Sequence, residues 1–176
     1  MTIRKTAAGH AFKRGQGRAV WFLGGLLTWK AVGSDTQGHY ELVEQLGKRG
    51  FASPIHTHER ETEGFYILEG NVSFILGSKT ISATPGSFLY VPQQTKHGFV
   101  VESEEAKFLV LISPSGLESF FDEIGKPAKS LTLPPPLESI PSPEQIEAVA
   151  VKYGQKFFGP PPTPDLNRQR KVDLKI

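Results

Sequence analysis

Short runs of β-branched and aromatic residues follow one another from residue 19 to residue 112. Turn-forming sequences separate the runs: GSDTQG (33–38), GKRG (47–50), ERET (59–62), EGN (69–71), GSK (77–79), TPG (84–86), PQQTK (92–96) and ESEEA (102–106). Short strands at such regular spacing are typical of an all-β sandwich or barrel. No helical periodicity lies between the runs, which argues against a parallel α/β fold.

Helical patterns begin only where the strands stop. In residues 113–127, Ser115 is a candidate N-cap, Gly125 and Pro127 form a stop signal, and one face is apolar: Leu117, Phe120, Phe121 and Ile124. A proline-rich connector (130–143) leads to a second short helix. That helix has Ser142 as its cap, Pro143 in the first helical position and Gln145 completing a capping box. Its apolar stripe is Ile146, Val149, Ala150 and Tyr153, and Gly154 ends it.

The pattern divides the chain into three parts. Residues 1–17 are polar and unpatterned and are expected to form an N-terminal arm. Residues 18–126 are expected to form the β-barrel with the first helix. Ten of the fourteen prolines lie from Pro127 onward, so residues 127–176 are expected to be a connector, a short helix and a tail packed on the barrel rather than a second core.

Composition narrows the chemistry. The 176 residues contain no cysteine, which excludes disulfides, thiolate metal sites and cysteine nucleophiles. The net charge of +2 is scattered and does not indicate nucleic-acid binding. The apolar run AVWFLGGLL (19–27) follows basic residues as in a signal peptide. It contains two glycines, lacks a cleavage site and is too short to cross a bilayer. We therefore expect a buried strand with a glycine bend, no membrane partner and a cytoplasmic protein.

Candidate metal ligands stand on neighbouring predicted strands. His56 and His58 are two residues apart, so on a strand both side chains point to the same face. Glu63 follows the ERET turn and can lie across from them on the next antiparallel strand. His97 comes later in the strand region. Histidine nitrogens and a carboxylate suit a divalent transition metal and leave coordination positions open for catalysis.

The spacing of these residues is more specific than their types. Gly50 precedes His56 by six positions and Gly70 follows Glu63 by seven, while Gly86 and Pro92 precede His97. This spacing resembles the two motifs of the cupin superfamily. Two positions depart from the motifs: Gln94 stands where the family usually has glycine, and Val101 stands where it often has asparagine. Neither position is a ligand.

The resemblance extends beyond the motifs. Residues 21–45 (WFLGGLLTWKAVGSDTQGHYELVEQ), residues 108–127 (FLVLISPSGLESFFDEIGKP) and residues 153–161 (YGQKFFGPP) look like the bacterial quercetin 2,3-dioxygenase-like single-domain cupins. The likeness spans roughly residues 20–162. It implies the double-stranded β-helix, or jelly-roll barrel, of the cupins, here with short C-terminal helices.

The resemblance also implies a site and an activity. The metal ligands would be His56, His58, Glu63 and His97, holding one divalent transition metal per chain: Fe, Mn, Ni or Co, with Cu and Zn as further options. The enzyme would be a metal-dependent dioxygenase that uses O₂ on a flavonol-like or other small enolisable substrate. Glu63 would also be the catalytic general base.

Four residues are candidates for an apolar substrate pocket. Phe65 and Ile67 share strand parity with Glu63, and Phe99 and Val101 share it with His97. They are also ordinary core residues by type, and both descriptions can hold for one residue. His10 in the arm and His39 beside a turn are expected to have no part in the site. The facing of Phe88 and Tyr90 is left open by the pattern.

Other functions remain open at this stage. A sugar or sugar-phosphate isomerase, or a small lyase, could use the same metal, although the predicted interior positions carry no Arg or Lys to bind phosphate. A non-catalytic small-molecule-binding cupin would need the same ligands. Exposed strand faces of jelly rolls are commonly paired, so a homodimer is expected, with Trp21, Trp29 or the C-terminal helices as candidate contacts.

Overall fold

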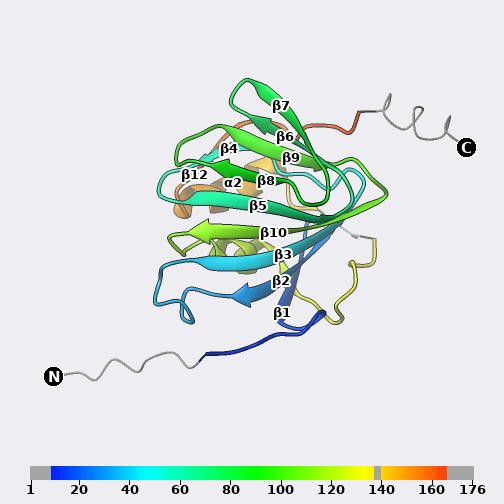
Figure 1. Ribbon diagram of the computed structural model, residues 1–176. Coiled ribbons are helices and arrows are strands. Elements are labelled where there is room, and N and C mark those ends of the chain that lie inside the picture. The colour runs from blue at the N-terminus through cyan, green and yellow to red at the C-terminus, as the bar shows by residue number, and fades with distance from the viewer. Residues whose placement is uncertain (1–8, 137–139, 166–176) are drawn as a thin grey trace, which may run out of the picture.

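Strands dominate the computed structural model, which describes residues 9–136 and 140–165 (Figure 1). The two short helices are α1 (Glu118–Ile124) and α2 (Pro143–Lys152). The strands of the described residues are β1 (Arg18–Phe22), β2 (Gly25–Ala31), β3 (Glu41–Lys48), β4 (Ile55–His58), β5 (Thr62–Glu69), β6 (Val72–Leu76), β7 (Lys79–Ala83), β8 (Phe88–Val91), β9 (His97–Val101), β10 (Glu105–Ser113), β11 (Lys126–Pro127) and β12 (Gln155–Gly159).

These strands form two antiparallel sheets that pack face to face as a jelly-roll β-barrel. One sheet has seven strands in the order β11-β1-β2-β3-β10-β5-β8, and the other has five in the order β12-β4-β9-β6-β7. Buried residues alternate with half-buried or exposed ones along β3 and β10, so one face of each strand is turned to the interior. The predicted all-β barrel with short C-terminal helices is confirmed.

The space between the sheets is filled with large apolar side chains. The largest fully buried ones include Trp29, Phe74, Phe108 and Ile67. Trp29 is only 2% exposed, so the suggestion that it contributes to a dimer contact is wrong for this fold. Trp21 is partly exposed and donates a hydrogen bond from Nε1 to the carbonyl of Thr132.

The apolar run at residues 19–27 is the β1–β2 hairpin. Leu23 and Gly24 make its turn with φ values of 47° and 91°, which confirms the predicted strand with a glycine bend. Among the described residues, no helix has the length and apolar character needed to cross a membrane.

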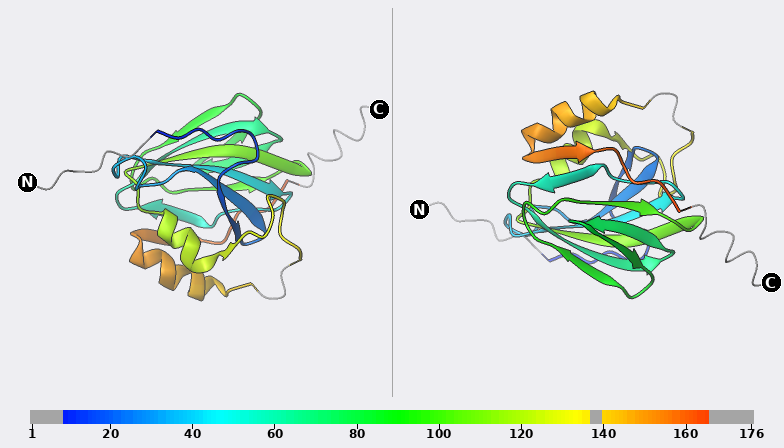
Figure 2. Two further views of the ribbon diagram at one scale, coloured as in Figure 1. Left: turned by 90° about the horizontal axis from the view of Figure 1, so that it is seen from below. Right: turned by 90° about the horizontal axis from the view of Figure 1, so that it is seen from above.

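The two helices lie side by side outside the sheets, with β12 next to them (Figure 2). The predicted capping box of α2 is confirmed, with Ser142 and Gln145 bonded to each other's backbone N–H groups. The predicted Ser115 cap of α1 is wrong. The carboxylate of Glu41, on β3, accepts hydrogen bonds from the backbone N–H groups of Gly116 and Glu118, at 2.8 and 3.2 Å, and takes the capping role.

The C-terminal part of the chain contributes a strand to the barrel. β12 pairs with β4 and forms one edge of the five-stranded sheet, where the sequence pattern predicted only a tail after the second helix. The predicted arm and tail lie partly in residues 1–8 and 166–176, which are outside the described residues, as are residues 137–139 of the connector.

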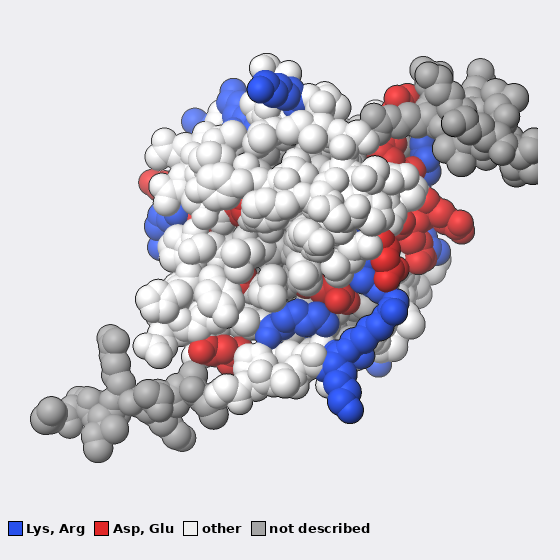
Figure 3. Space-filling view, in the orientation of Figure 1, with Lys and Arg blue, Asp and Glu red and all other residues white. Residues whose placement is uncertain are grey.

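The outer face of the seven-stranded sheet carries exposed apolar side chains. Tyr66 and Phe88 are cross-strand partners, as are Gly64 and Tyr90, and Leu111 lies opposite Gly64 on the other side. Phe88 and Tyr90 are 62% and 56% exposed, so both point away from the interior. The front of the molecule shows few charges over this region (Figure 3). We call Tyr66, Phe88, Tyr90 and Leu111 the aromatic patch.

The turn before β9 explains the motif position occupied by Gln94. Its backbone has a φ of 58°, in the left-handed region that glycine adopts without steric cost. The Gln94 N–H donates to the carbonyl of His58 at 2.9 Å, which ties this turn to β4. Gly50, Gly70 and Gly86, the other motif glycines, also have positive φ values. The motif spacing therefore reflects turn geometry as well as ligands.

Replacing Gln94 with glycine should stabilise the protein. The left-handed conformation costs a non-glycine residue roughly 1–2 kcal/mol, and the extra freedom of glycine in the unfolded chain returns roughly 0.5–1 kcal/mol of that. We expect Gln94→Gly to raise the free energy of unfolding by about 0.5–1 kcal/mol in urea titration. Gln93→Gly, one position earlier and outside the left-handed region, is the control and should not stabilise. A less stable Gln94→Gly variant would contradict the assignment of strain.

Candidate metal centre

Four ionisable side chains meet in the interior between the two sheets. His56 and His58 come from β4, and His97 on β9 is the direct cross-strand partner of His56. Glu63 comes from β5 in the opposite sheet. One nitrogen or oxygen atom from each of these residues lies within 4.8 Å of the others, and all four residues are buried. The structure thus brings together the four residues that the sequence motifs single out.

The contacts within the cluster are short. Nε2 of His97 lies 2.7 Å from Oε2 of Glu63, and Nε2 of His58 lies 3.2 Å from the same oxygen. Nε2 of His56 lies 3.1 Å from Nε2 of His58. All three imidazoles therefore turn their Nε2 atoms toward the carboxylate and toward one another.

Backbone carbonyls orient two of the rings from behind. Nδ1–H of His56 donates to the carbonyl of Pro54, and Nδ1–H of His97 donates to that of Thr95, each at 2.8 Å. A proton on Nδ1 leaves the Nε2 lone pair of the neutral ring free to bind a cation in the cluster. Nδ1 of His58 is buried and has no hydrogen-bond partner among the described residues.

Burial and mutual charge set the protonation of the cluster. Burial lowers the pKa of His56 to about 3, and the neighbouring His97 and His58 act in the same direction, so this ring is neutral. Burial opposes the charge of Glu63, but His58 and His97 outweigh it and hold the pKa of this carboxyl well below its usual range. Burial also opposes the charge of His97, but Glu63 outweighs it and raises the pKa of the ring.

The donor set fits a divalent transition metal. Convergent imidazole nitrogens with one ionised carboxylate suit Fe, Mn, Co, Ni, Cu and Zn alike, so the donors indicate a metal without selecting one. Because a buried carboxylate is costly unless it is paired, a cation at this point would satisfy Glu63 and the Nε2 lone pairs together.

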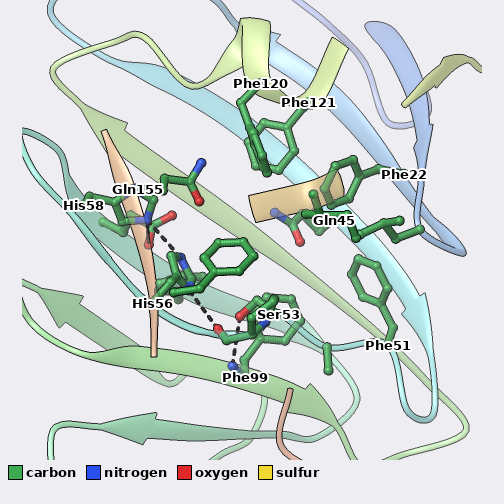
Figure 4. Close-up of a pocket in the computed structure, with 17 residues that line it drawn as sticks. Phe22, Gln45, Phe51, Ser53, His56, His58, Phe99, Phe120, Phe121 and Gln155 are labelled. Carbon is green, nitrogen blue, oxygen red and sulfur yellow. Dashed lines mark hydrogen bonds and ion pairs between the residues drawn. The ribbon is translucent and has the colours of Figure 1, made fainter. Parts of the chain in front are cut away.

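A cavity leads to the cluster and is walled by phenylalanine (Figure 4). His56, His58 and Glu63 line it together with Phe22, Phe51, Phe65, Phe99, Phe120, Phe121 and Phe157. Of the four pocket residues predicted from strand parity, Phe65 and Phe99 line this cavity. Ile67 and Val101, each 0% exposed, lie in the hydrophobic core and are not among the lining residues.

Sequence reasoning missed much of the cavity wall. The helical pattern of Phe120 and Phe121 predicted that they cover the core. They do so, and they also line the cavity. Phe157 on β12 is the cross-strand partner of His56 on β4. No local sequence pattern predicted that pairing. Phe51 packs its ring against Gly25 and Gly47, where an added Cβ would come within 2.5 and 2.3 Å of it. The glycines on β2 and β3 were the only sequence signal that a large side chain such as Phe51 packs at this point.

The other histidines lie away from the cluster. His10 is exposed, and its Nε2 contacts the carbonyl of Lys30 at 2.8 Å. His39 is exposed in the turn before β3. Neither lines the cavity.

Comparison with known proteins finds a match to the part of the chain that carries the cluster. Residues 42–112 match the family model of the cupin domain. Quercetin 2,3-dioxygenase of Bacillus subtilis is 33% identical over 104 residues, which are 59% of this chain and 31% of that enzyme. The match therefore spans about a third of the length of that relative.

Two solved structures share the fold. An RmlC-like cupin from Shewanella frigidimarina superposes with a TM-score of 0.54 at 18% identity, covering 63% of this chain and 96% of that one. A predicted oxalate decarboxylase from Thermotoga maritima gives a TM-score of 0.51 at 18% identity, covering 57% and 94%. Residues 42–112 thus match the cupin domain, and the jelly-roll barrel and the buried histidine–glutamate cluster agree with that match.

Proposed function

We propose that this protein is a metal-dependent dioxygenase that acts on a flavonol-like or other small enolisable aromatic substrate. The observation that carries the proposal is the cluster of three histidines and one glutamate at a cavity walled by seven phenylalanines. The similarity to a quercetin 2,3-dioxygenase supports the reaction class.

His56, His58, Glu63 and His97 would hold the metal. When bound, the metal would supply Lewis acidity toward an enol oxygen and the redox chemistry that O₂ requires. The chain provides the setting for that chemistry. Backbone carbonyls fix the rings of His56 and His97, and the apolar wall excludes water from the reacting groups.

Glu63 is the candidate general base. The histidines keep its carboxylate ionised, so it can accept a proton without first losing one. Its Oε2 contacts His58 and His97, and no described residue hydrogen-bonds to Oε1. Oε1 is therefore the atom that we assign to take the hydroxyl proton of an enolisable substrate.

The cavity lining favours a flat, uncharged ligand. Aromatic rings form large, rigid apolar surfaces that stack with other rings. No Lys or Arg is among the residues that line the cavity, so it lacks the cations that a sugar phosphate would need. This observation weighs against the isomerase alternative. A non-catalytic binding protein would use the same residues. Measurements of turnover distinguish it from the proposed enzyme.

Metal binding should depend on each histidine of the cluster. The wild type should hold about one divalent metal per chain, and chelation should lower its melting temperature because a bound ligand stabilises the folded state. His56→Ala and His97→Ala should each weaken metal affinity by at least about 100-fold, since loss of even a supporting contact costs 10–100-fold. Metal analysis measures the metal content, and competition with a chromogenic chelator measures the affinity. His39→Ala is the control. Full metal content in His97→Ala would contradict the ligand assignment.

Replacing the base should separate binding from turnover. Glu63→Gln keeps an oxygen donor of the same shape but cannot accept the proton, so we expect it to retain part of the metal and to lose about 10²–10⁴-fold in turnover. Oxygen consumption should be measured on protein reloaded with one metal at a time, against flavonols and other enolisable compounds. Full oxygen uptake by Glu63→Gln would exclude Glu63 as the base, and no uptake by any wild-type sample would favour a binding function.

We also infer a homodimer that pairs two copies of the aromatic patch. β8 is the edge strand of its sheet in the described part of the chain, so its outer backbone groups could pair with β8 of a second chain. Phe88 and Tyr90 on that strand are more than half exposed, and the surrounding face carries few charges (Figure 3). An apolar edge of this kind is commonly covered in the native protein.

Light scattering at micromolar concentration tests the dimer. The wild type should show twice the chain mass, and Phe88→Glu should shift it toward the monomer, because a charge in the patch opposes its burial. Thr80→Glu, exposed on β7 outside the patch, should not change the mass. A monomeric wild type would refute the dimer.

A further inference from the structure

One buried side-chain amide beside the histidine–glutamate cluster has an Nε2 without a hydrogen-bond partner among the described residues. Gln155 is the first residue of β12 and lies directly opposite His58 in the antiparallel pairing with β4. Cross-strand partners project from the same face of a sheet, so the Gln155 side chain enters the interior with His58. It is 5% exposed, and its Nε2 makes no hydrogen bond with any described residue.

The cavity beside this amide is mostly apolar, and its polar lining residues include His58 and Glu63 of the cluster. Gln155 lines the cavity, and most of the other lining residues are apolar (Figure 4). Gln45 enters the same cavity from β3 in the opposite sheet. Buried amides in native proteins are nearly always hydrogen-bonded, so an amide facing a cavity without a partner points to a group that arrives with the ligand.

We propose that Gln155 is a substrate-positioning residue, whose amide Nε2–H donates a hydrogen bond to an oxygen of the bound substrate. The inference rests on the proposed function and sharpens its substrate class to oxygen-bearing aromatic compounds with a hydroxyl or keto oxygen within reach of this amide. A neutral amide suits such an oxygen, whereas a carboxylate or phosphate group would require the cations that the lining lacks.

Specificity for an oxygen follows from the burial of the donor. A site that holds a buried donor binds the matching oxygen and discriminates against an analogue without it, because the donor then stays unpaired. The cavity would otherwise select only by shape and apolar surface. Because β12 lies outside residues 42–112, this selection would be made by a segment beyond the cupin domain match.

Two ligands of the same ring shape test the hydrogen bond. 3-Hydroxyflavone carries ring, keto and hydroxyl oxygens, and 2-phenylnaphthalene has a similar skeleton without oxygen. Binding to the metal-loaded protein is measured by anaerobic fluorescence titration, so that turnover plays no part. We expect Gln155→Leu to weaken 3-hydroxyflavone binding at least about tenfold and to change 2-phenylnaphthalene binding less than about twofold. Lys156→Gln, the exposed neighbour on β12, should change neither.

Two further readouts separate this role from a structural one. Metal content should be unchanged in Gln155→Leu, whereas a residue that acted by holding the His58 ring would reduce it. The urea midpoint should equal or exceed that of the wild type, since leucine removes an unpaired buried amide. Equal weakening of both ligands, no weakening of either, a loss of metal or a lower midpoint would each overturn the inference.

Failure of the proposed function would look different. A wild type that binds 3-hydroxyflavone without consuming oxygen would remove the dioxygenase assignment and leave the Gln155 comparison intact. If the wild type bound neither ligand, the flavonol class would fall. The inference about Gln155 would fall with it, because binding of an oxygen-bearing aromatic compound is its premise.

Discussion

The cost of burying Glu63 inside an apolar barrel is the constraint on which the rest of this structure depends. A carboxylate removed from water is tolerated only when opposite charge or strong donors replace the lost hydration. The structure meets this need with His58 and His97, both within 3.2 Å of its Oε2. A metal cation bound between these groups would take over this role, because ligand nitrogens must be free of protons before they bind a metal.

The scaffold holds these groups rigidly through the backbone. The carbonyls of Pro54 and Thr95 fix two rings, and the β4–β9 register fixes the spacing between His56 and His97. Turns with positive φ values close the strands that carry the ligands, and one of them uses Gln94 in place of glycine. The left-handed backbone of Gln94 costs conformational free energy, and this turn sets the direction of β9, which carries His97.

Much of the centre could be predicted from sequence because its determinants are local. His56 and His58 share a face by strand parity alone. The turn at residues 59–62 does not make the predicted hairpin: β5 lies in the opposite sheet from β4, so Glu63 faces the histidines across the interior of the barrel. The turn signals also predicted the all-β fold. The α2 cap was readable because both of its partners lie within four residues of each other.

The errors arose where the decisive partner is distant in sequence. Ser115 has the right type and position for a cap, but Glu41 reaches α1 from a strand more than seventy residues earlier. Ile67 and Val101 have the right parity for a pocket, yet their depth in the barrel places them in the core. Parity fixes which face a side chain takes and says nothing about how far along the barrel the cavity extends.

The cluster and the cavity wall come from different segments of the chain. The four side chains of the candidate metal centre all lie within residues 42–112, the segment that matches the cupin domain. Phe22, Phe120, Phe121 and Phe157, which wall the cavity, lie outside it on β1, α1 and β12. A change in these flanking segments can alter the shape and polarity of the pocket without moving any residue of the metal cluster. Under the proposed function, these flanking segments would select the substrate while the cluster would hold the metal.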